Sequence, residues 1–439
     1  MKNIELRMRI HRKMILLCYF AFFFIFLPSC YYIMTKLSNI GDKVKKPSAL
    51  KHESKVNQLE ELIKSNVRNL SVQYKITSTE ANELLDEFIN NLNDTKSIQD
   101  YRSVWNQIKN GIRENTLFSS NCNYLGTALN ALSTAKIIAA DVDSRGTQLK
   151  LLLTLEGEAN AVFKPQWYPI DKIISGPVYA GKDRFNAEIF AFFLSGLLDF
   201  RIVPFTVERI INLEKDIYPV ATERLRNTIV KRDNNIWCVY GVCHYCKPSE
   251  LACSQTNKHF NDLIGVRGAL IYHIPKKLKL HRSPWQRKYK GNQPMRWQYQ
   301  NDYCENTVKK KLTTNEILDL IDASIFDFLI QNGDRHHYET LNNKIVLLDN
   351  GKGLGNPLIH HLDILAPLYQ CCIIRMKTWM RLLAMTGNNF RKYLNEFVKL
   401  NKEMITELHL NAIEERLLII YSAVELCIMR FPKQNIYIE

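Results

Sequence analysis

The sequence feature that most restricts the fold is an apolar segment near the N-terminus. Residues 14–35 (MILLCYFAFFFIFLPSCYYIMT) contain no charged side chain, and about 20 apolar residues are enough to cross a bilayer as a helix. A cleaved signal peptide would have a shorter apolar region and a clear small-residue cleavage site, and neither is evident. We therefore expect a retained membrane anchor, with a short tail at 1–13 on the cytoplasmic side and the rest of the chain on the other.

Lys and Arg residues lie on both sides of the anchor, so the positive-inside rule does not orient it. The eleven cysteines do, because most of those outside the anchor form local groups, which is typical of disulfides in an oxidising lumen. Asn69 and Asn93 also begin glycosylation acceptor sequences. We therefore expect a single-pass type II protein with a lumenal body.

The chain is strongly basic, with 59 Lys and Arg against 44 Asp and Glu, a formal net charge of +15. Such a charge suits anionic partners, including nucleotides, acidic glycans and membranes, although a solubilising surface is the simpler interpretation. No aromatic and basic recognition motif is present, so we expect no nucleic-acid partner.

Changes in sequence pattern predict the order of the elements. Residues 36–70 are polar and rich in Lys, which indicates a stem. Residues 76–112 show helical spacing of apolar residues. The stretch GTQLKLLLTLEGEANAVFKP then alternates strongly, which predicts an antiparallel hairpin that turns at 156–160 and ends at Lys164.

The pattern becomes mainly helical after this hairpin. RFNAEIFAFFLSGLLDF predicts a helix that carries Glu188 among apolar neighbours, and RIVPFTVERIINL predicts a further strand. Helices are expected over 315–330 and 414–431. We therefore expect an α+β body, with a region of mixed structure at 71–225 and a mainly helical region at 226–439.

Two acidic residues lie between those last helices, in NGDRHHYETLNNKIVLLDNGKG. Asp334 directly follows the first helix, whereas Asp349 ends a short apolar strand, KIVLLD. Gly351 is expected to let the backbone turn sharply after Asp349.

The order of these parts is that of a kinase. Phosphoryl transfer needs positioning, neutralisation of the triphosphate, and a carboxylate for the hydroxyl proton. Lys164 would contact phosphates and Glu188 would pair with it or hold metal. Asp349 would bind Mg²⁺ or Mn²⁺, and Asp334 would orient the acceptor hydroxyl.

The local motifs differ from those of ordinary protein kinases, which contain H-R-D-x-x-x-x-N and D-F-G. Glu339 occupies the place of the usual metal-binding Asn, and it is either a ligand or a structural residue. His336 and His337 are adjacent, and adjacent side chains seldom converge on one ion, so we expect them to brace the loop.

Six sequence stretches together carry a family resemblance: GTQLKLLLTLEGEANAVFKP, RFNAEIFAFF, LLDFRIVP, NGDRHHYE, LLDNGKGLGNP and APLYQCC. From about residue 115 to the C-terminus, the chain resembles the secretory-pathway atypical kinases of the four-jointed-related group (family with sequence similarity twenty). RSPWQRKYKGNQPMRWQYQNDYC and DNGKGLGNP resemble most the branch that phosphorylates the 2-hydroxyl of xylose in the glycosaminoglycan–protein linkage region.

The resemblance implies an atypical two-lobed kinase in the Golgi that uses ATP with Mn²⁺ or Mg²⁺. The acceptor would be the xylose-containing linkage glycan of proteoglycan core proteins, and homo- or hetero-oligomers with related kinases would be possible. The resemblance implies that Asp334 is the catalytic base and that Asp349 and Glu188 bind the metal. It also implies that the nucleotide is bound by Lys164, Gln148 and Lys150.

The resemblance also implies disulfides. Cys238 and Cys253 would enclose an inner Cys243–Cys246 bridge. Cys304 and Cys427 would each pair with one of Cys371 and Cys372, and Cys122 has no obvious partner. The C-x₂-C spacing of Cys243 and Cys246 also allows zinc, but the outer spacings do not form a second such pair.

The sequence leaves four functions in competition. A sugar kinase and a secreted Ser/Thr protein kinase would share the nucleotide site; Trp285 or Trp297 could line a sugar pocket, although packing is their commoner role. An ATP-binding pseudokinase is disfavoured because the three acidic site residues are present. A glycosyltransferase would use an Asp-x-Asp motif, which DVD at 141–143 supplies only weakly. The family's usual acidic segment after GLGNP is replaced by LIHHLDI at 358–364.

Overall fold

The computed structural model describes residues 55–78, 82–112, 116–257, 263–289, 293–401 and 403–439. The predicted anchor at 14–35 and the tail that precedes it lie outside these residues. Across the described part of the chain, no helix is both long and apolar enough to cross a membrane.

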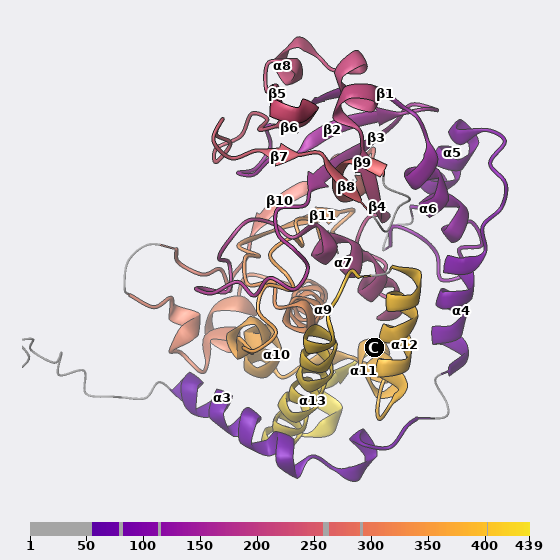
Figure 1. The fold of residues 1–439 in the computed structure, drawn as a ribbon. Helices are drawn as coiled ribbons and strands as arrows, with labels where there is room; N and C mark the ends of the chain where they lie inside the picture. Colours follow the sequence, from indigo (N-terminus) through magenta and orange to yellow (C-terminus); the bar gives the residue numbers. More distant parts are fainter. Residues whose placement is uncertain (1–54, 79–81, 113–115, 258–262, 290–292, 402) are drawn as a thin grey trace, which may run out of the picture. The chain divides into compact units, whose positions relative to one another are not determined.

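An antiparallel sheet forms the first part of the body (Figure 1). Its strand order is β1-β2-β3-β9-β4, and β8 also pairs with β9. The predicted hairpin is confirmed, because β2 and β3 pair antiparallel and Lys164 lies near the end of β3, opposite Ala269 of β9. The strands are β1 (Ile137–Val142), β2 (Leu151–Leu155), β3 (Ala159–Pro165), β4 (Thr206–Ile211), β8 (Gln255–Asn257) and β9 (Leu263–Tyr272).

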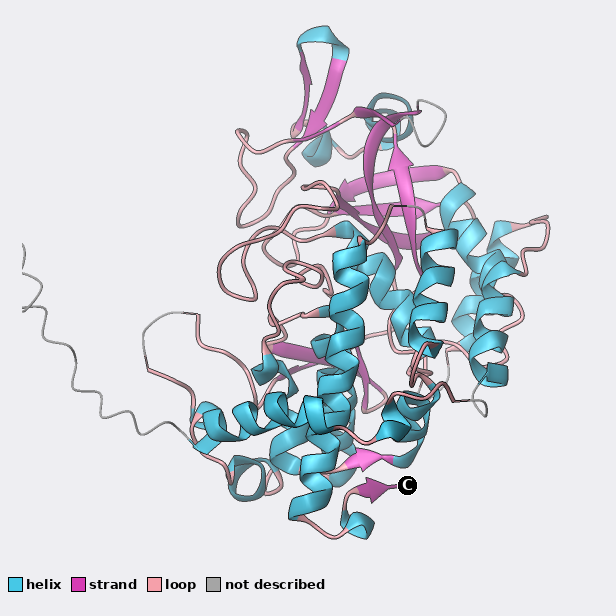
Figure 2. Ribbon diagram, turned by 60° about the horizontal axis from the view of Figure 1, so that its bottom comes forward, coloured by secondary structure: helices cyan, strands magenta, loops and turns pink. Residues whose placement is uncertain are grey.

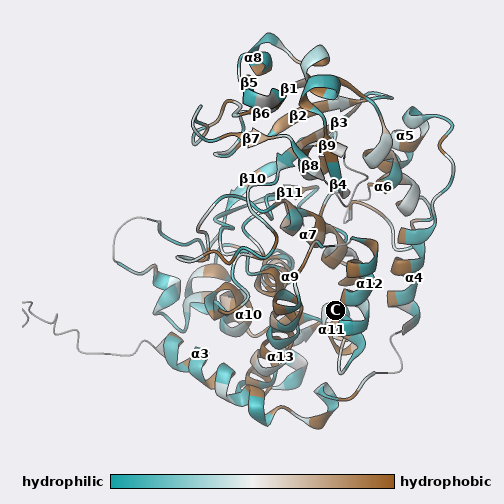
Figure 3. Cartoon of the chain, viewed as in Figure 1, coloured by the Kyte–Doolittle hydropathy of each residue, from teal (hydrophilic) through white to brown (hydrophobic). Residues whose placement is uncertain are grey.

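Helix α7 (Phe185–Leu197) packs against β4 and β9 and is buried along its whole length. Its sequence is apolar on nearly every side, as expected of a helix enclosed by other elements, and Figure 3 shows the same enrichment in hydrophobic residues. The outer helices here are α4 (Asn82–Asn93), α5 (Tyr101–Gly111) and α6 (Leu125–Thr134). The helical prediction for 76–112 therefore becomes two helices, and Asp100 caps α5 by accepting from two backbone N–H groups.

A helical layer forms the second part of the body (Figure 2). Its longest members are α9 (Thr314–Ile330) and α13 (Glu407–Arg430). The prediction for α9 is confirmed to within one residue, whereas α13 begins earlier than 414 because Thr406 provides an N-cap. The other helices are α10 (Ala366–Cys371), α11 (Met376–Ala384) and α12 (Asn389–Leu400), and a parallel pair, β13 (Ile374–Arg375) and β14 (Tyr437–Ile438), lies beside them.

Helix α3 (Lys55–Asn66) corrects part of the stem prediction. Its Val56 and Ile63 are buried, and the backbone carbonyl of Ile63 accepts a hydrogen bond from Ser422 of α13. Glu60 of the same helix accepts one from Tyr369 of α10. The stem was predicted from the polar composition of this segment, which did not reveal the two apolar positions on one face of the helix. The folded body therefore begins by Lys55 and not after residue 70.

Two small sheets complete the fold. β5 (Ile229–Arg232), β6 (Ile236–Val239) and β7 (Ala252–Cys253) form one, next to α8 (Glu223–Arg226). β10 (Lys279–Arg282), β11 (His337–Leu341) and β12 (Lys344–Val346) form the other, in that order. The short helical turns are Val67–Asn69, Val72–Tyr74, Leu213–Ile217, Tyr218–Val220, Asp233–Asn235, Arg296–Gln298, Cys304–Val308, Leu362–Leu365 and Lys433–Asn435.

Among the residues that the structure describes there are four disulfides, and they match the predicted set. Their pairs are Cys238–Cys253, Cys243–Cys246, Cys304–Cys371 and Cys372–Cys427. The structure thus decides which partner each member of the adjacent Cys371 and Cys372 takes. Paired sulfurs are not zinc ligands, so the zinc interpretation is wrong, and Cys122 is buried with a free thiol.

Candidate active site

Lys164 is the centre of the candidate site. Its side chain is only 5% exposed, and its ammonium lies 2.5 Å from Glu188 Oε1, 2.7 Å from Asp349 Oδ1 and 3.6 Å from Asp183 Oδ2. Burial alone would lower the pKa of Lys164, but these carboxylates together raise it well above its usual value. The sequence prediction that Lys164, Glu188 and Asp349 act together therefore has a geometric basis.

Glu188 connects three parts of the fold. It lies in the first turn of α7, where the helix dipole favours a negative charge. One carboxylate oxygen contacts Lys164 of β3, and the other accepts the backbone N–H of Asn350 at 3.1 Å. A buried charge needs such partners, because an unpaired one would be very costly.

Asp349 faces outward from the same cluster, with 62% of its side chain exposed. Lys164 is the main reason that its pKa is held well below the usual range, and Lys150, 3.1 Å away, acts in the same direction. Strand β12 ends at Val346, so Asp349 lies in the following loop and not on the strand as expected. Its backbone has a left-handed φ of 51°.

The role predicted for Gly351 is wrong in its reason. The residue with positive φ is Asp349, and Gly351 does not share that conformation. What Gly351 provides is space, because a Cβ added there would lie 2.6 Å from the Cβ of Asp183. Close packing of two loops, and not a sharp turn, therefore requires a glycine at this position.

Asp183 is a site residue that sequence reasoning missed. Gln148 donates to its carboxylate and accepts its backbone N–H, each at 2.8 Å. Lys352 Nζ lies 3.6 Å from Oδ1, the same carboxylate oxygen that accepts from Gln148. Asp183 could have been found from the sequence, because it lies two residues before α7, the helix that carries Glu188. Gln148 and Lys150, both assigned from sequence, are thereby placed at the site.

Asp334 lies in the loop after α9, which ends at Ile330 and is followed by Gln331 in a left-handed conformation. The Tyr289 hydroxyl donates to Asp334 Oδ1 at 2.5 Å and also lies 3.0 Å from His336 Nδ1. Burial raises the pKa of Asp334, and the hydrogen bond from Tyr289 opposes that rise. Lys352 and Asp183 are close enough to influence its pKa electrostatically, so Asp334 lies near the Lys164 cluster.

Arg335 holds the two acidic loops together, and no sequence pattern predicted this role. Its guanidinium forms two hydrogen bonds with Asp327 of α9. It also donates to the carbonyl of Leu348 at 2.9 Å and to Asn350 Oδ1 at 2.8 Å. A planar fork with several fixed donors is suited to such a junction. Arg335 thus fixes the Asp334 loop relative to the Asp349 loop.

The carboxylates of this cluster fit a divalent metal. Among the described residues no three His, Cys, Asp or Glu side chains already surround one point, because the Lys164 ammonium lies between Glu188, Asp349 and Asp183. Carboxylate oxygens are nevertheless the donors that Mg²⁺ and Mn²⁺ prefer. Glu339 lies near Arg335 and Asp349, and burial raises its pKa.

The less favoured candidates have structural roles. Trp285 and Trp297 are buried, and their indole N–H groups bond to Gln370 and to the carbonyl of Gln286. His336 Nδ1 donates to the backbone carbonyl of Asp334 at 2.8 Å, within its own loop, as expected of a bracing residue. The carboxylates of the DVD segment are held by Thr222, for Asp141, and by Arg145, for Asp143.

Side-chain contacts tie the segment at 358–364 to the body. His360 contacts Glu415 and Arg416 of α13, whereas Asp363 pairs with Arg287. Asn69 and Asn93, the expected glycosylation positions, are both exposed.

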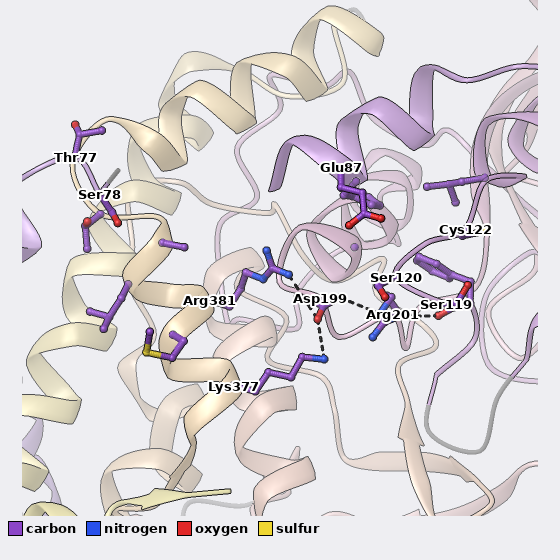
Figure 4. Close-up of a pocket in the computed structure, with 18 of the residues that line it drawn as sticks. Thr77, Ser78, Glu87, Ser119, Ser120, Cys122, Asp199, Arg201, Lys377 and Arg381 are labelled. Atoms are coloured by element: carbon purple, nitrogen blue, oxygen red, sulfur yellow. Dashed lines mark hydrogen bonds and ion pairs between the residues drawn. The ribbon is translucent and has the colours of Figure 1, made fainter. Parts of the chain in front are cut away.

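A separate cavity of about 740 Å³ lies at the opposite end of α7 (Figure 4). Lys377, Arg381 and Arg201 surround Asp199 on its wall. Burial raises the pKa of its free cysteine, Cys122, to about 11, so that thiol stays protonated. No lining residue belongs to the Lys164 cluster, so the cavity is not the nucleotide site.

Comparison with known proteins identifies the family. A family model described as "Golgi casein kinase, C-terminal, Fam20" matches residues 103–436, most of the chain. The chain belongs to the Fam20 family. This confirms the resemblance found in the sequence.

Several Fam20 relatives are similar over most of their length. The "Glycosaminoglycan xylosylkinase homolog" of Drosophila melanogaster is 40% identical, over 86% of this chain and 89% of the relative. The human "Glycosaminoglycan xylosylkinase" is 40% identical, over 72% and 78%. The human "Extracellular serine/threonine protein kinase FAM20C" is 33% identical, over 74% and 58%.

Two solved Fam20 structures share the fold. The structure of hydra Fam20 with sugar has a TM-score of 0.72 and 38% identity, and the match covers 76% of this chain and 98% of the other. The Golgi casein kinase with Mn/ADP bound has a TM-score of 0.70 and 25% identity, with 90% and 95% covered. The chain therefore has the Fam20 kinase-like fold, which combines helices with antiparallel sheets.

Proposed function

We propose that this protein transfers the γ-phosphate of ATP to the 2-hydroxyl of xylose in the glycosaminoglycan–protein linkage region, and thereby promotes glycosaminoglycan synthesis. The observation that carries the kinase activity is the buried Lys164–Glu188–Asp349 cluster beside the hydrogen-bonded Asp334. The choice of xylose rests on relatives named xylosylkinases at 40% identity, against 33% for the protein kinase FAM20C.

The chemistry of the site follows from its charges. Bound ATP with Mn²⁺ or Mg²⁺ supplies the phosphoryl group and neutralises its developing charge; Mn/ADP in a related Golgi casein kinase supports this cofactor. Asp349 and Glu188 would hold the metal. Lys164 and Lys150 would turn from carboxylates to phosphates, while Gln148 keeps Asp183 in place.

Asp334 receives the proton of the acceptor hydroxyl. Its carboxylate accepts a hydrogen bond from the Tyr289 hydroxyl, and this contact supports the proposal that it can also accept one from a substrate hydroxyl. General-base catalysis needs that reach first and a suitable pKa second. The presence of Asp334, Asp349 and Glu188 together argues against the pseudokinase alternative.

We further propose a Golgi-lumenal, type II arrangement, with the chain anchored by residues 14–35 and a two-lobed kinase body. The four disulfides of the body support an oxidising compartment. Assembly into homo- or hetero-oligomers with related kinases stays a prediction.

The test is a phosphotransfer assay with full-length protein in detergent, labelled ATP and Mn²⁺. The acceptors are a galactosyl-xylose glycan and an acidic, casein-like peptide. We expect label on the glycan alone, lost in Asp349→Asn and kept in the matched surface variant Asp216→Asn. Label on the peptide alone would support the protein-kinase alternative; ATP binding without label on either acceptor would support the pseudokinase.

A further inference from the structure

Positive charge is concentrated in one segment of this protein. Residues 276–296 contain eight Lys and Arg and no Asp or Glu. The net charge of the whole chain is +15, so the positive charge of this short segment equals more than half of the net charge of the chain. A local concentration of one sign attracts ligands of the opposite sign.

This segment borders the acceptor side of the site. Arg282 of β10 is directly paired with His337 of β11, three residues after Asp334. The backbone N–H of Ser283 donates to the carbonyl of His336 at 2.9 Å, and Tyr289 reaches Asp334 itself. A substrate whose hydroxyl lies at Asp334 therefore has β10 as a neighbour.

Most of the described cations of this segment form no ion pair with another described residue. Arg287 pairs with Asp363. Five others are exposed and form no ion pair with any described residue: Lys276, Lys277, Lys279, Arg282 and Lys288. Lys279 has Glu316 as a distant acidic neighbour, but that carboxylate already accepts from Thr313. Their positive potential is thus directed to solvent.

β10 also offers a backbone edge. It is the outer strand of the β10-β11-β12 sheet, and among the described residues no strand pairs with its other side. Leu280, 62% exposed, lies on the same face as Arg282 because side chains alternate along a strand. An exposed edge with unpaired N–H and C=O groups can accept an extended peptide as an additional strand.

We propose that β10 and its flanking lysines bind an acidic, extended segment of the polypeptide that carries the acceptor xylose. The inference rests on the proposed function and adds the carrier protein to its substrate. From residue 276 to 282 an extended chain covers about 20 Å, longer than a disaccharide. A backbone edge beside an exposed leucine fits polypeptide better than glycan, which has no ladder of amide groups.

The test compares acceptors with the full-length enzyme. Three acceptors carry the same xylose disaccharide: free glycan, a peptide with Glu flanking the xylosylated Ser, and the same peptide with Gln. A fourth is a free glycan that ends in a uronic acid. The variant is Lys277→Gln, Lys279→Gln and Arg282→Gln together. The matched control removes the same charge from α8 and β5 with Arg224→Gln, Lys231→Gln and Arg232→Gln.

We expect kcat/KM on the Glu peptide to exceed that on the Gln peptide by about tenfold. This preference for the Glu peptide should decrease as salt is added. The β10 variant should lose this preference and keep wild-type activity on the free glycan, whereas the control variant should keep both. Three results together would establish that this surface binds the peptide: the preference for the Glu peptide, the loss of that preference in the β10 variant, and its decrease with salt.

Three outcomes would overturn the inference. Equal rates on the two peptides would mean that the lysines do not bind the acceptor polypeptide and only prevent unwanted strand pairing at the β10 edge. An equal loss in the control variant would show a general charge effect. Enhancement by the uronic acid but not by the peptide would place the anion on the glycan. A wild-type enzyme inactive on every xylose acceptor would instead refute the proposed function.

Discussion

At the scale of single residues, opposing influences set the state of the candidate base. Burial raises the pKa of Asp334, and the Tyr289 hydroxyl opposes that rise by bonding to the carboxylate. A general base must be ionised, so activity should fall as pH falls through the pKa of Asp334. Tyr289 therefore extends activity toward lower pH.

Tyr289→Phe removes that hydrogen bond, so the pKa of Asp334 should rise further. A hydrogen bond to a charged group is worth about 1.5–3 kcal/mol, which corresponds to a shift of about one to two pH units. We expect the acid limb of the kcat/KM profile to move upward by that amount. Tyr299→Phe, at an exposed tyrosine, is the control; an unmoved limb in Tyr289→Phe would contradict Asp334 as the base.

At the scale of elements, the site depends on a junction between α9 and two loops. Arg335 binds Asp327 of α9 and also donates to the loop of Asp349 through Leu348 and Asn350. The pair is almost completely buried. Removal of one member of such a pair leaves an uncompensated charge or an unsatisfied fork.

A double-mutant cycle tests this junction. Asp327→Asn and Arg335→Gln should each lower the free energy of unfolding by about 3–5 kcal/mol. The double variant should cost clearly less than the sum, because both charges disappear together. The measurement is urea unfolding of the four proteins. Additive effects would mean that the two side chains stabilise the fold independently.

At the scale of the whole molecule, disulfides join segments that are distant in sequence. Cys372–Cys427 closes a loop of 55 residues and ties α10 to α13, whereas Cys243–Cys246 spans only three. In the chain-entropy model, a longer closed loop restricts the unfolded chain more. The C-terminal helix should therefore depend on its disulfide more than the loop after β6 does.

Paired Cys→Ser replacements give the comparison. Loss of Cys372–Cys427 should lower the free energy of unfolding by about 4 kcal/mol, and loss of Cys243–Cys246 by about 2 kcal/mol. Denaturant unfolding under non-reducing conditions measures both, with the intact protein as reference. Equal losses, or a larger loss for the short loop, would contradict an entropic origin.

Much of the fold and of the site could be predicted where the signal was local. Lys164 closes an alternating hairpin, Glu188 lies in an apolar helix, and Asp334 directly follows another. Each is marked by the periodicity of its own segment. The family resemblance predicted the cysteine pairs. It could not decide which of the adjacent Cys371 and Cys372 pairs with Cys304 and which with Cys427.

The sequence by itself thus determined the order of the four central residues and the elements that carry them, because periodic burial is encoded within short windows. Only the tertiary structure decided the rest. Asp183, Arg335 and Tyr289 enter the site through partners 8 to 45 residues away, α3 joins the body through α13, and Gly351 is required by a packed neighbour. These features depend on contacts between separate segments, which no local pattern records.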